Sequence, residues 1–163
     1  MWVDQPGYLS SPFLVDRSAD ASEQVTARFA AGHHEVLASI GGAWRRVADG
    51  RVDANRQWFV AGSPLQVAIG FSESDVVAGA VQVSPPLLFH PEELSIDRPS
   101  SAVPLSDAQA HIALRRRLIA AQKRRRDTFQ FCSICRTYLP PEAYVGSQPC
   151  RGCNAQYFGL MID

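Results

Sequence analysis

Short runs of hydrophobic residues follow one another through the first half of the chain, and most are rich in the β-branched and aromatic residues that favour strands. The runs are residues 34–40, 43–47, 57–61, 65–71 and 76–83. Glycine, serine, proline or aspartate separates them, and Asp49-Gly50 is typical of a hairpin turn. Several short strands at this spacing predict a mostly antiparallel sheet.

A short helix is predicted before these strands, and a proline-rich segment follows them. Residues 20–31 have helical spacing, with Val25, Phe29 and Ala30 on the buried side. Residues 85–104 contain five prolines and few strong patterns. We therefore expect this second segment to be a connector on the surface.

The clearest helix of the chain is predicted at residues 105–127. Ser106 and Gln109 form a capping box at its start, because each side chain can bond the backbone amide of the other residue. Two hydrophobic stripes run along this helix, so we expect it to contact two neighbours. The first stripe is Ala110, Leu114, Leu118 and Ala121, and the second is Ile112 and Ile119.

The composition is that of a chain with an ordinary hydrophobic core. Of its 163 residues 46% are hydrophobic and 20% are charged. No apolar run is long enough to span a bilayer, so we expect no membrane segment. The N-terminal residues lack the basic start and apolar core of a secretory signal. We therefore expect a cytoplasmic protein, in which disulfides are disfavoured.

All four cysteines lie near the C-terminus, in two C-x-x-C pairs that are separated by fourteen residues. The pairs are Cys132 with Cys135, and Cys150 with Cys153. The two-residue gap lets both sulfurs of a pair point at one ion, and two such pairs complete a tetrahedron around Zn²⁺. Four thiolates leave no position for water, so the predicted zinc is structural. A disulfide pair, a thiol redox motif and a rubredoxin-like iron site are the alternatives.

A helix that leads into C-x2-C-x14-C-x2-C and is followed by Tyr157-Phe158 resembles the zinc ribbon of NADH pyrophosphatases. The resemblance covers residues 106–158 and implies that the four cysteines are zinc ligands. In that family a Nudix domain with a glutamate-rich Mg²⁺ box follows the ribbon, whereas the six glutamates of this chain form no such box. The resemblance therefore implies the fold of the C-terminal part and not the reaction. Zinc modules of HNH-type nucleases are also similar, but no histidine follows His111 to complete their site.

Together these features predict an α+β fold in three parts: a mostly antiparallel sheet with a short N-terminal helix, then a long helix, then a zinc ribbon with four cysteine ligands. Residues 1–104 form the α+β domain and include the proline-rich connector at its end. Residues 105–128 form the basic helix, and residues 129–163 form the ribbon.

The net charge of zero hides two oppositely charged parts. Residues 1–114 carry a net charge of −6, and residues 115–163 carry +6. Seven of the sixteen basic residues lie in two clusters on the long helix. They are Arg115, Arg116, Arg117, Lys123, Arg124, Arg125 and Arg126. Such a helix beside a zinc ribbon is typical of phosphate contact in DNA or RNA binding. The alternatives are a protein partner, pairing with the acidic part of the chain, or a solvated face.

Two other patterns suggest catalysis, but each has a simpler explanation. His33 and His34 point to opposite faces if they begin a strand, so they do not easily share one site. Gly70 to Ser74 is close to a nucleophile elbow but lacks glycine at the fifth position. We therefore expect no enzymatic activity.

The preferred function is binding, with one structural Zn²⁺ and with nucleic acid held by the basic helix and the ribbon. The alternative is a protein-binding module, such as an inhibitor, an immunity-type protein or a regulatory adaptor. The proline-stiffened loop at residues 138–144 is then a candidate docking tip, unless it packs under the ribbon.

Overall fold

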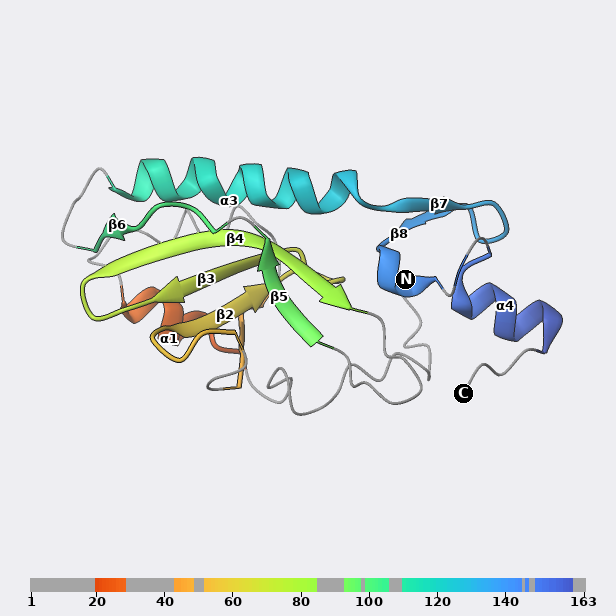
Figure 1. Ribbon diagram of the computed structural model, residues 1–163, viewed down its shortest axis with the longest axis horizontal. Coiled ribbons are helices and arrows are strands. Elements are labelled where there is room, and N and C mark those ends of the chain that lie inside the picture. The colour runs from red at the N-terminus through yellow and green to blue at the C-terminus, as the bar shows by residue number, and fades with distance from the viewer. Residues whose placement is uncertain are drawn as a thin grey trace.

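The structure is a computed structural model, and it describes residues 20–28, 43–48, 52–84, 93–97, 99–105, 110–144, 146 and 149–159. The molecule is elongated, with a β-sheet at one end and the ribbon that carries the cysteines at the other (Figure 1). The long helix α3 (Ala110–Asp127) lies along the sheet and leads directly into the ribbon. This arrangement confirms the predicted α+β class with a long helix and a C-terminal cysteine cluster.

The sheet is antiparallel throughout, as predicted. Its strands are β1 (Arg45–Arg46), β2 (Gln57–Ala61), β3 (Val67–Phe71), β4 (Asp75–Ser84), β5 (Glu93–Asp97) and β6 (Val103–Pro104). They lie in the order β1-β2-β3-β4-β5, and β6 pairs with the start of β4. The strand predicted at residues 34–40 and the turn at Asp49-Gly50 lie outside the described residues.

The expected connector at residues 85–104 is corrected in part, because it contains β5 and β6. β4 is ten residues long and pairs with β3 along one edge, which leaves its other edge open to further strands. β5 pairs with its second half and β6 with its first two residues. Leu94 and Val103 are buried and anchor these two strands. Strands this short give too little hydrophobic pattern to stand out among prolines.

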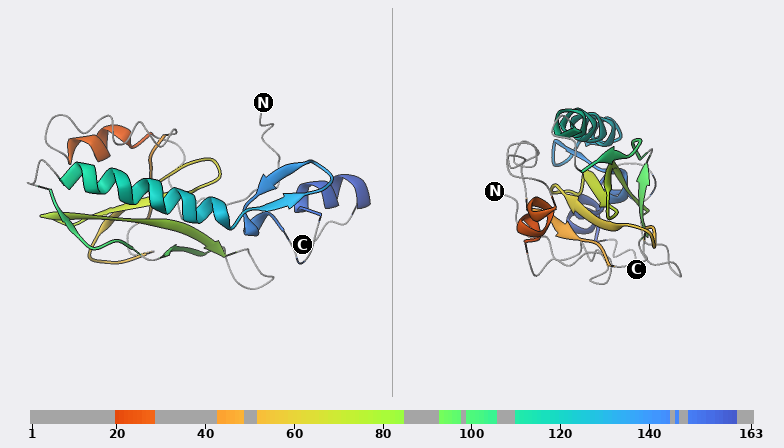
Figure 2. Two further views of the ribbon diagram at one scale, coloured as in Figure 1. Left: turned by 90° about the horizontal axis from the view of Figure 1, so that it is seen from above. Right: turned by 90° about the vertical axis from the view of Figure 1, so that its left-hand side faces the viewer.

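Alternate residues of the strands build two hydrophobic clusters, one on each face of the sheet. Phe59, Ile69 and Phe71 lie on the face that is covered by α1 (Ser22–Ala27) and α3 (Figure 2). Trp58 and Val60 belong to the cluster on the opposite face, as the two-residue period of a strand requires. The helix predicted at residues 20–31 is shorter, because α1 ends at Ala27. Val25 is buried, as expected. Phe29 and Ala30 lie outside the described residues.

The first stripe of α3 contacts the sheet and the second one does not. Leu114, Leu118 and Ala121 are buried against it, as predicted. Ile112 and Ile119 are 51% and 48% exposed, so the stripe for which we expected a second neighbour faces solvent. The capping box at Ser106 and Gln109 and the side chain of Ala110 lie outside the described residues. No helix in the described part of the chain is both long enough and apolar enough to cross a membrane.

Candidate metal centre

The ribbon consists of a small hairpin, a short turn and a helix. Its elements are β7 (Gln130–Cys132), β8 (Thr137–Leu139), the 3-10 turn η1 (Pro141–Ala143) and α4 (Arg151–Phe158). The first cysteine pair lies in the hairpin: Cys132 ends β7, and Cys135 lies in the turn before β8. Arg136 has a φ of 55°, which lets the chain reverse directly after Cys135.

The second cysteine pair lies at the start of α4. Cys150 is the N-cap residue, and its carbonyl accepts a hydrogen bond from the amide of Asn154 at 2.8 Å. Cys153 follows in the first turn of the helix and is buried. The N-terminal end of a helix carries partial positive charge, which offsets part of the cost of burying a thiolate at these two positions.

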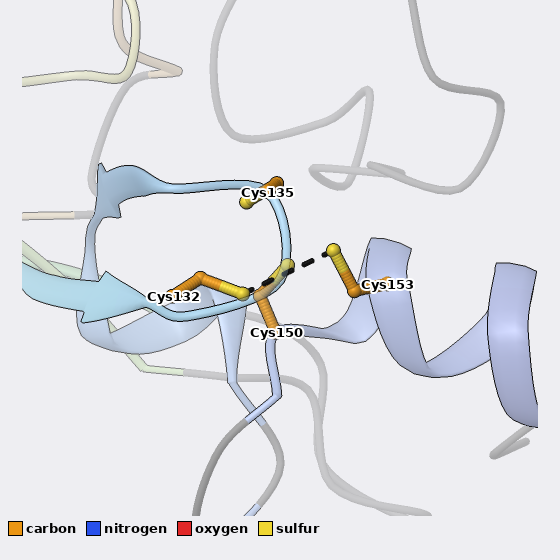
Figure 3. Close-up of side chains that lie close together, drawn as sticks. All are labelled: Cys132, Cys135, Cys150 and Cys153. Atoms are coloured by element: carbon orange, nitrogen blue, oxygen red, sulfur yellow. Dashed lines mark hydrogen bonds between the residues drawn. The ribbon is translucent and has the colours of Figure 1, made fainter.

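All four sulfurs point toward one another and lie within 4.8 Å of each other (Figure 3). Cys132 Sγ and Cys153 Sγ are 3.9 Å apart, far beyond the roughly 2.05 Å of a disulfide. A tetrahedral site with bonds of about 2.3 Å places its sulfurs about 3.8 Å apart. All four cysteines are free, so the disulfide alternative does not describe this site. The cysteines are positioned to hold a metal ion.

Burial and neighbouring groups shift the pKa of three of the cysteines in different directions. Burial opposes ionisation of Cys132, yet hydrogen bonds from the backbone of Cys150, Cys135 and Ile134 lower its pKa to about 6. Burial raises the pKa of Cys150, and burial together with the neighbouring thiols raises the pKa of Cys153. The protein alone therefore favours the thiolate of Cys132 and resists those of Cys150 and Cys153. A bound cation removes that resistance, because it compensates the charge of all four sulfurs.

A small core surrounds the cysteines and contains the second half of the loop at residues 138–144. Ala143 and Tyr144 are buried against Cys132, Cys150 and Cys153. The Tyr144 hydroxyl donates to the carbonyl oxygen of Gln130 at 2.8 Å, and burial raises the pKa of Tyr144 to about 12. This half of the loop thus packs under the ribbon, whereas Tyr138 at its start is exposed.

The last turn of α3 attaches the ribbon to the sheet through Arg125, which is only 3% exposed. Its guanidinium donates from Nη2 to the Glu142 carboxylate in η1 and from Nε to the Leu65 carbonyl oxygen at 3.1 Å. It also lies over the Phe129 ring, 5.5 Å from the centroid. One buried side chain thus joins the helix, the sheet and the metal-site module.

The predicted basic face is therefore divided into side chains with internal partners and exposed ones. Arg125 is corrected, because its buried ion pair removes it from any surface contact. Arg117 donates to Ser101, and Arg126 Nε donates to the Gln66 side chain at 2.9 Å while the residue remains exposed. Arg115, Arg116 and Lys123 are exposed, and Arg124 is half-buried.

Sequence reasoning missed Glu142 as the partner of Arg125, although one signal was available. Residue 125 continues the spacing of the buried stripe Leu114, Leu118 and Ala121, so it faces the sheet. A charged residue at such a position needs a buried partner. The partner itself lies seventeen residues further along the chain, and no local pattern selects it.

Comparisons with protein-family models, with curated proteins and with solved structures find no match to this chain.

Proposed function

We propose that the four cysteines hold one structural Zn²⁺ and that the chain acts by binding nucleic acid through the outer face of α3 and the ribbon. Four sulfur ligands favour zinc or iron among biological metals, and a closed set offers no open position for catalysis. Metal analysis of the purified chain tests the first part. One zinc per chain is expected, and stoichiometric iron would overturn the choice of metal.

The observation that carries the nucleic-acid proposal is the charge on the exposed side of α3. Arg115, Arg116, Lys123 and Arg126 are exposed there. Within the described residues, the ion pairs of this helix join Lys123 to Asp127 and Arg125 to Glu142, and neither acid belongs to the acidic first part of the chain. Among the described residues, no ion pair joins the exposed cations to that acidic part. Cations on one exposed face attract phosphates and release their counterions.

The test is fluorescence anisotropy with labelled DNA and RNA, single-stranded and duplex, over a range of salt concentrations. Binding is expected to weaken steeply with salt, and Arg116→Ala with Lys123→Ala is expected to reduce the slope by about 0.9 for each duplex phosphate that the variant no longer neutralises. Arg28→Ala with Arg45→Ala is the matched control, because it removes two charges near α1. No binding at low salt, or an equal effect of the control, would overturn the proposal.

A protein partner is the second candidate, and the exposed isoleucines of α3 favour it. Ile112, Arg116, Ile119 and Lys123 have the same four-three-four spacing as the buried stripe, shifted by two residues or about 200°. They therefore form a mixed apolar and basic stripe opposite the sheet. A nuclease-resistant, stoichiometric partner that no longer binds after Ile112→Ser with Ile119→Ser would support this function over nucleic-acid binding.

A further inference from the structure

The β7–β8 hairpin presents an aromatic pair to solvent. Phe131 and Tyr138 lie directly opposite each other in the hairpin register, with ring centroids 5.2 Å apart and planes inclined by 55°. Tyr138 is 66% exposed and Phe131 is 41% exposed. Because the rings are tilted rather than stacked, Phe131 supports the Tyr138 ring without covering its face.

The two faces of the hairpin have separate roles. Cys132 follows Phe131 in β7 and is paired with Thr137, so its side chain points to the other face and into the metal site. The metal site and its small core do not need the Tyr138 ring, which faces solvent on the opposite side. Because the Tyr138 ring is exposed and does not belong to the small core around the cysteines, it is available for contact with a ligand.

The segment that contains α3 and this hairpin has a net positive charge. Residues 115–139 contain eight basic side chains and one acidic side chain. Only two residues separate the end of α3 from β7, and the hairpin continues the line of the helix (Figures 1 and 2). The contacts of Arg125 with Phe129 and Glu142 fix this arrangement. The hairpin that carries the aromatic pair thus lies directly after the helix that carries the exposed cations, along the length of the molecule.

We propose that Tyr138, supported by Phe131, stacks on an unpaired base, so that the ligand of this chain is single-stranded nucleic acid whose backbone follows the basic face of α3. The inference rests on the proposed nucleic-acid function and adds the class of nucleic acid to it. A basic track next to exposed aromatic rings is what single strands require, since every base has a face that stacks. The bases of a duplex already stack on each other and leave the tyrosine without a partner.

The experiment compares the metal-loaded full chain with three variants in anisotropy titrations. The probes are a fluorescein-labelled oligothymidylate of about 20 nucleotides, which exceeds the site of one small domain, and a duplex of equal length. Tyr138→Thr removes the ring but keeps a residue that favours strands, and Tyr138→Phe keeps the ring. Tyr157→Ala is the matched control, because Tyr157 is also exposed, at 63%, but lies on α4.

Tyr138→Thr is expected to weaken binding of the single strand by roughly 5- to 150-fold, the range for removal of one stacked base, and to leave duplex binding unchanged. Tyr138→Phe and Tyr157→Ala are expected to bind like the wild type. Metal content of each variant confirms that the ribbon is folded. If the threonine variant loses metal, weaker single-strand binding by metal-loaded Tyr138→Phe would still overturn the stacking role, because this variant keeps the ring.

The outcomes separate the two proposals. Binding of single strands that Tyr138→Thr does not weaken would overturn the stacking role and leave the nucleic-acid function standing. Equal weakening for single strand and duplex would also overturn it. Absence of binding to every probe at low salt would overturn the nucleic-acid function itself, and a protein partner that requires Tyr138 would replace both.

Discussion

Substitution of Glu142 by glutamine tests whether the ribbon is held to the rest of the molecule by a buried charge pair. Glutamine has nearly the same size and keeps an oxygen that accepts from Arg125, so the change removes mainly the negative charge. Arg125 then remains buried as a cation without a counter-charge. Glu142→Gln should therefore lower the free energy of unfolding and loosen the ribbon first.

The magnitude follows from the burial of the pair. Arg125 and Glu142 are 3% and 7% exposed, so water screens them little. Two unit charges at about 4 Å attract each other by about 4 kcal/mol at an effective dielectric constant near 20. Removal of one member of a buried pair costs about 3–5 kcal/mol. Because glutamine retains a hydrogen bond, we expect a decrease of about 3 kcal/mol in the free energy of unfolding.

The assay is urea denaturation followed by two signals. Tryptophan fluorescence reports the sheet, where Trp44 and Trp58 are buried, and metal release to a chromogenic chelator reports the ribbon. In Glu142→Gln the metal signal should shift to lower urea than the fluorescence signal. Arg125→Met with Glu142→Gln should recover part of the stability, because it leaves no unpaired buried charge.

Lys123→Ala is the control, since it breaks the exposed pair with Asp127, whose side chains are 79% and 65% exposed. It should change the free energy of unfolding by about 0.5 kcal/mol or less. If Glu142→Gln also changed it by only about 0.5 kcal/mol, as surface substitutions do, the assigned role of the buried pair would be refuted.

Three further predictions concern the metal, the sheet and acid stability. Cys150→Ser should abolish stoichiometric metal binding and unfold the ribbon, whereas the tryptophan fluorescence of the sheet should remain native. Metal analysis and fluorescence spectroscopy check these two outcomes. Retained stoichiometric metal would contradict the four-thiolate site. Gly70→Ala should lower the free energy of unfolding by about 1–3 kcal/mol in a urea titration, because its Cβ would lie 2.8 Å from the Trp58 ring. The Arg56 guanidinium beside Asp75 holds the pKa of that carboxyl below its usual 3.8. The stabilisation by this pair is complete above pH 3.8 and is lost as the pH falls through the lower pKa that Asp75 has in the folded state. Asp75→Asn should therefore weaken the dependence of the free energy of unfolding on pH in this acidic range. An unchanged dependence would contradict the role of the pair.

The sequence alone determined the features that depend on local chain geometry. The C-x-x-C spacing brings two sulfurs together in any tight turn, so the cysteine cluster could be predicted without knowledge of the fold. The positions of β2, β3 and β4 followed from composition and turn residues. The buried stripe of α3 followed from the helical period, which fixes the residues that share one side.

The tertiary structure decided the features that depend on what lies opposite. β5 and β6 are strands because β4, which pairs with β3 on one side, offers its other edge to both of them. Arg125 looks like its basic neighbours in the sequence but is buried, because the Leu65 carbonyl and Glu142 meet it at the junction. Ile119 has the spacing of a core residue, yet it is exposed because the sheet covers only one side of α3. Local periodicity tells which residues share a face, but only the packing of distant segments decides which face is covered.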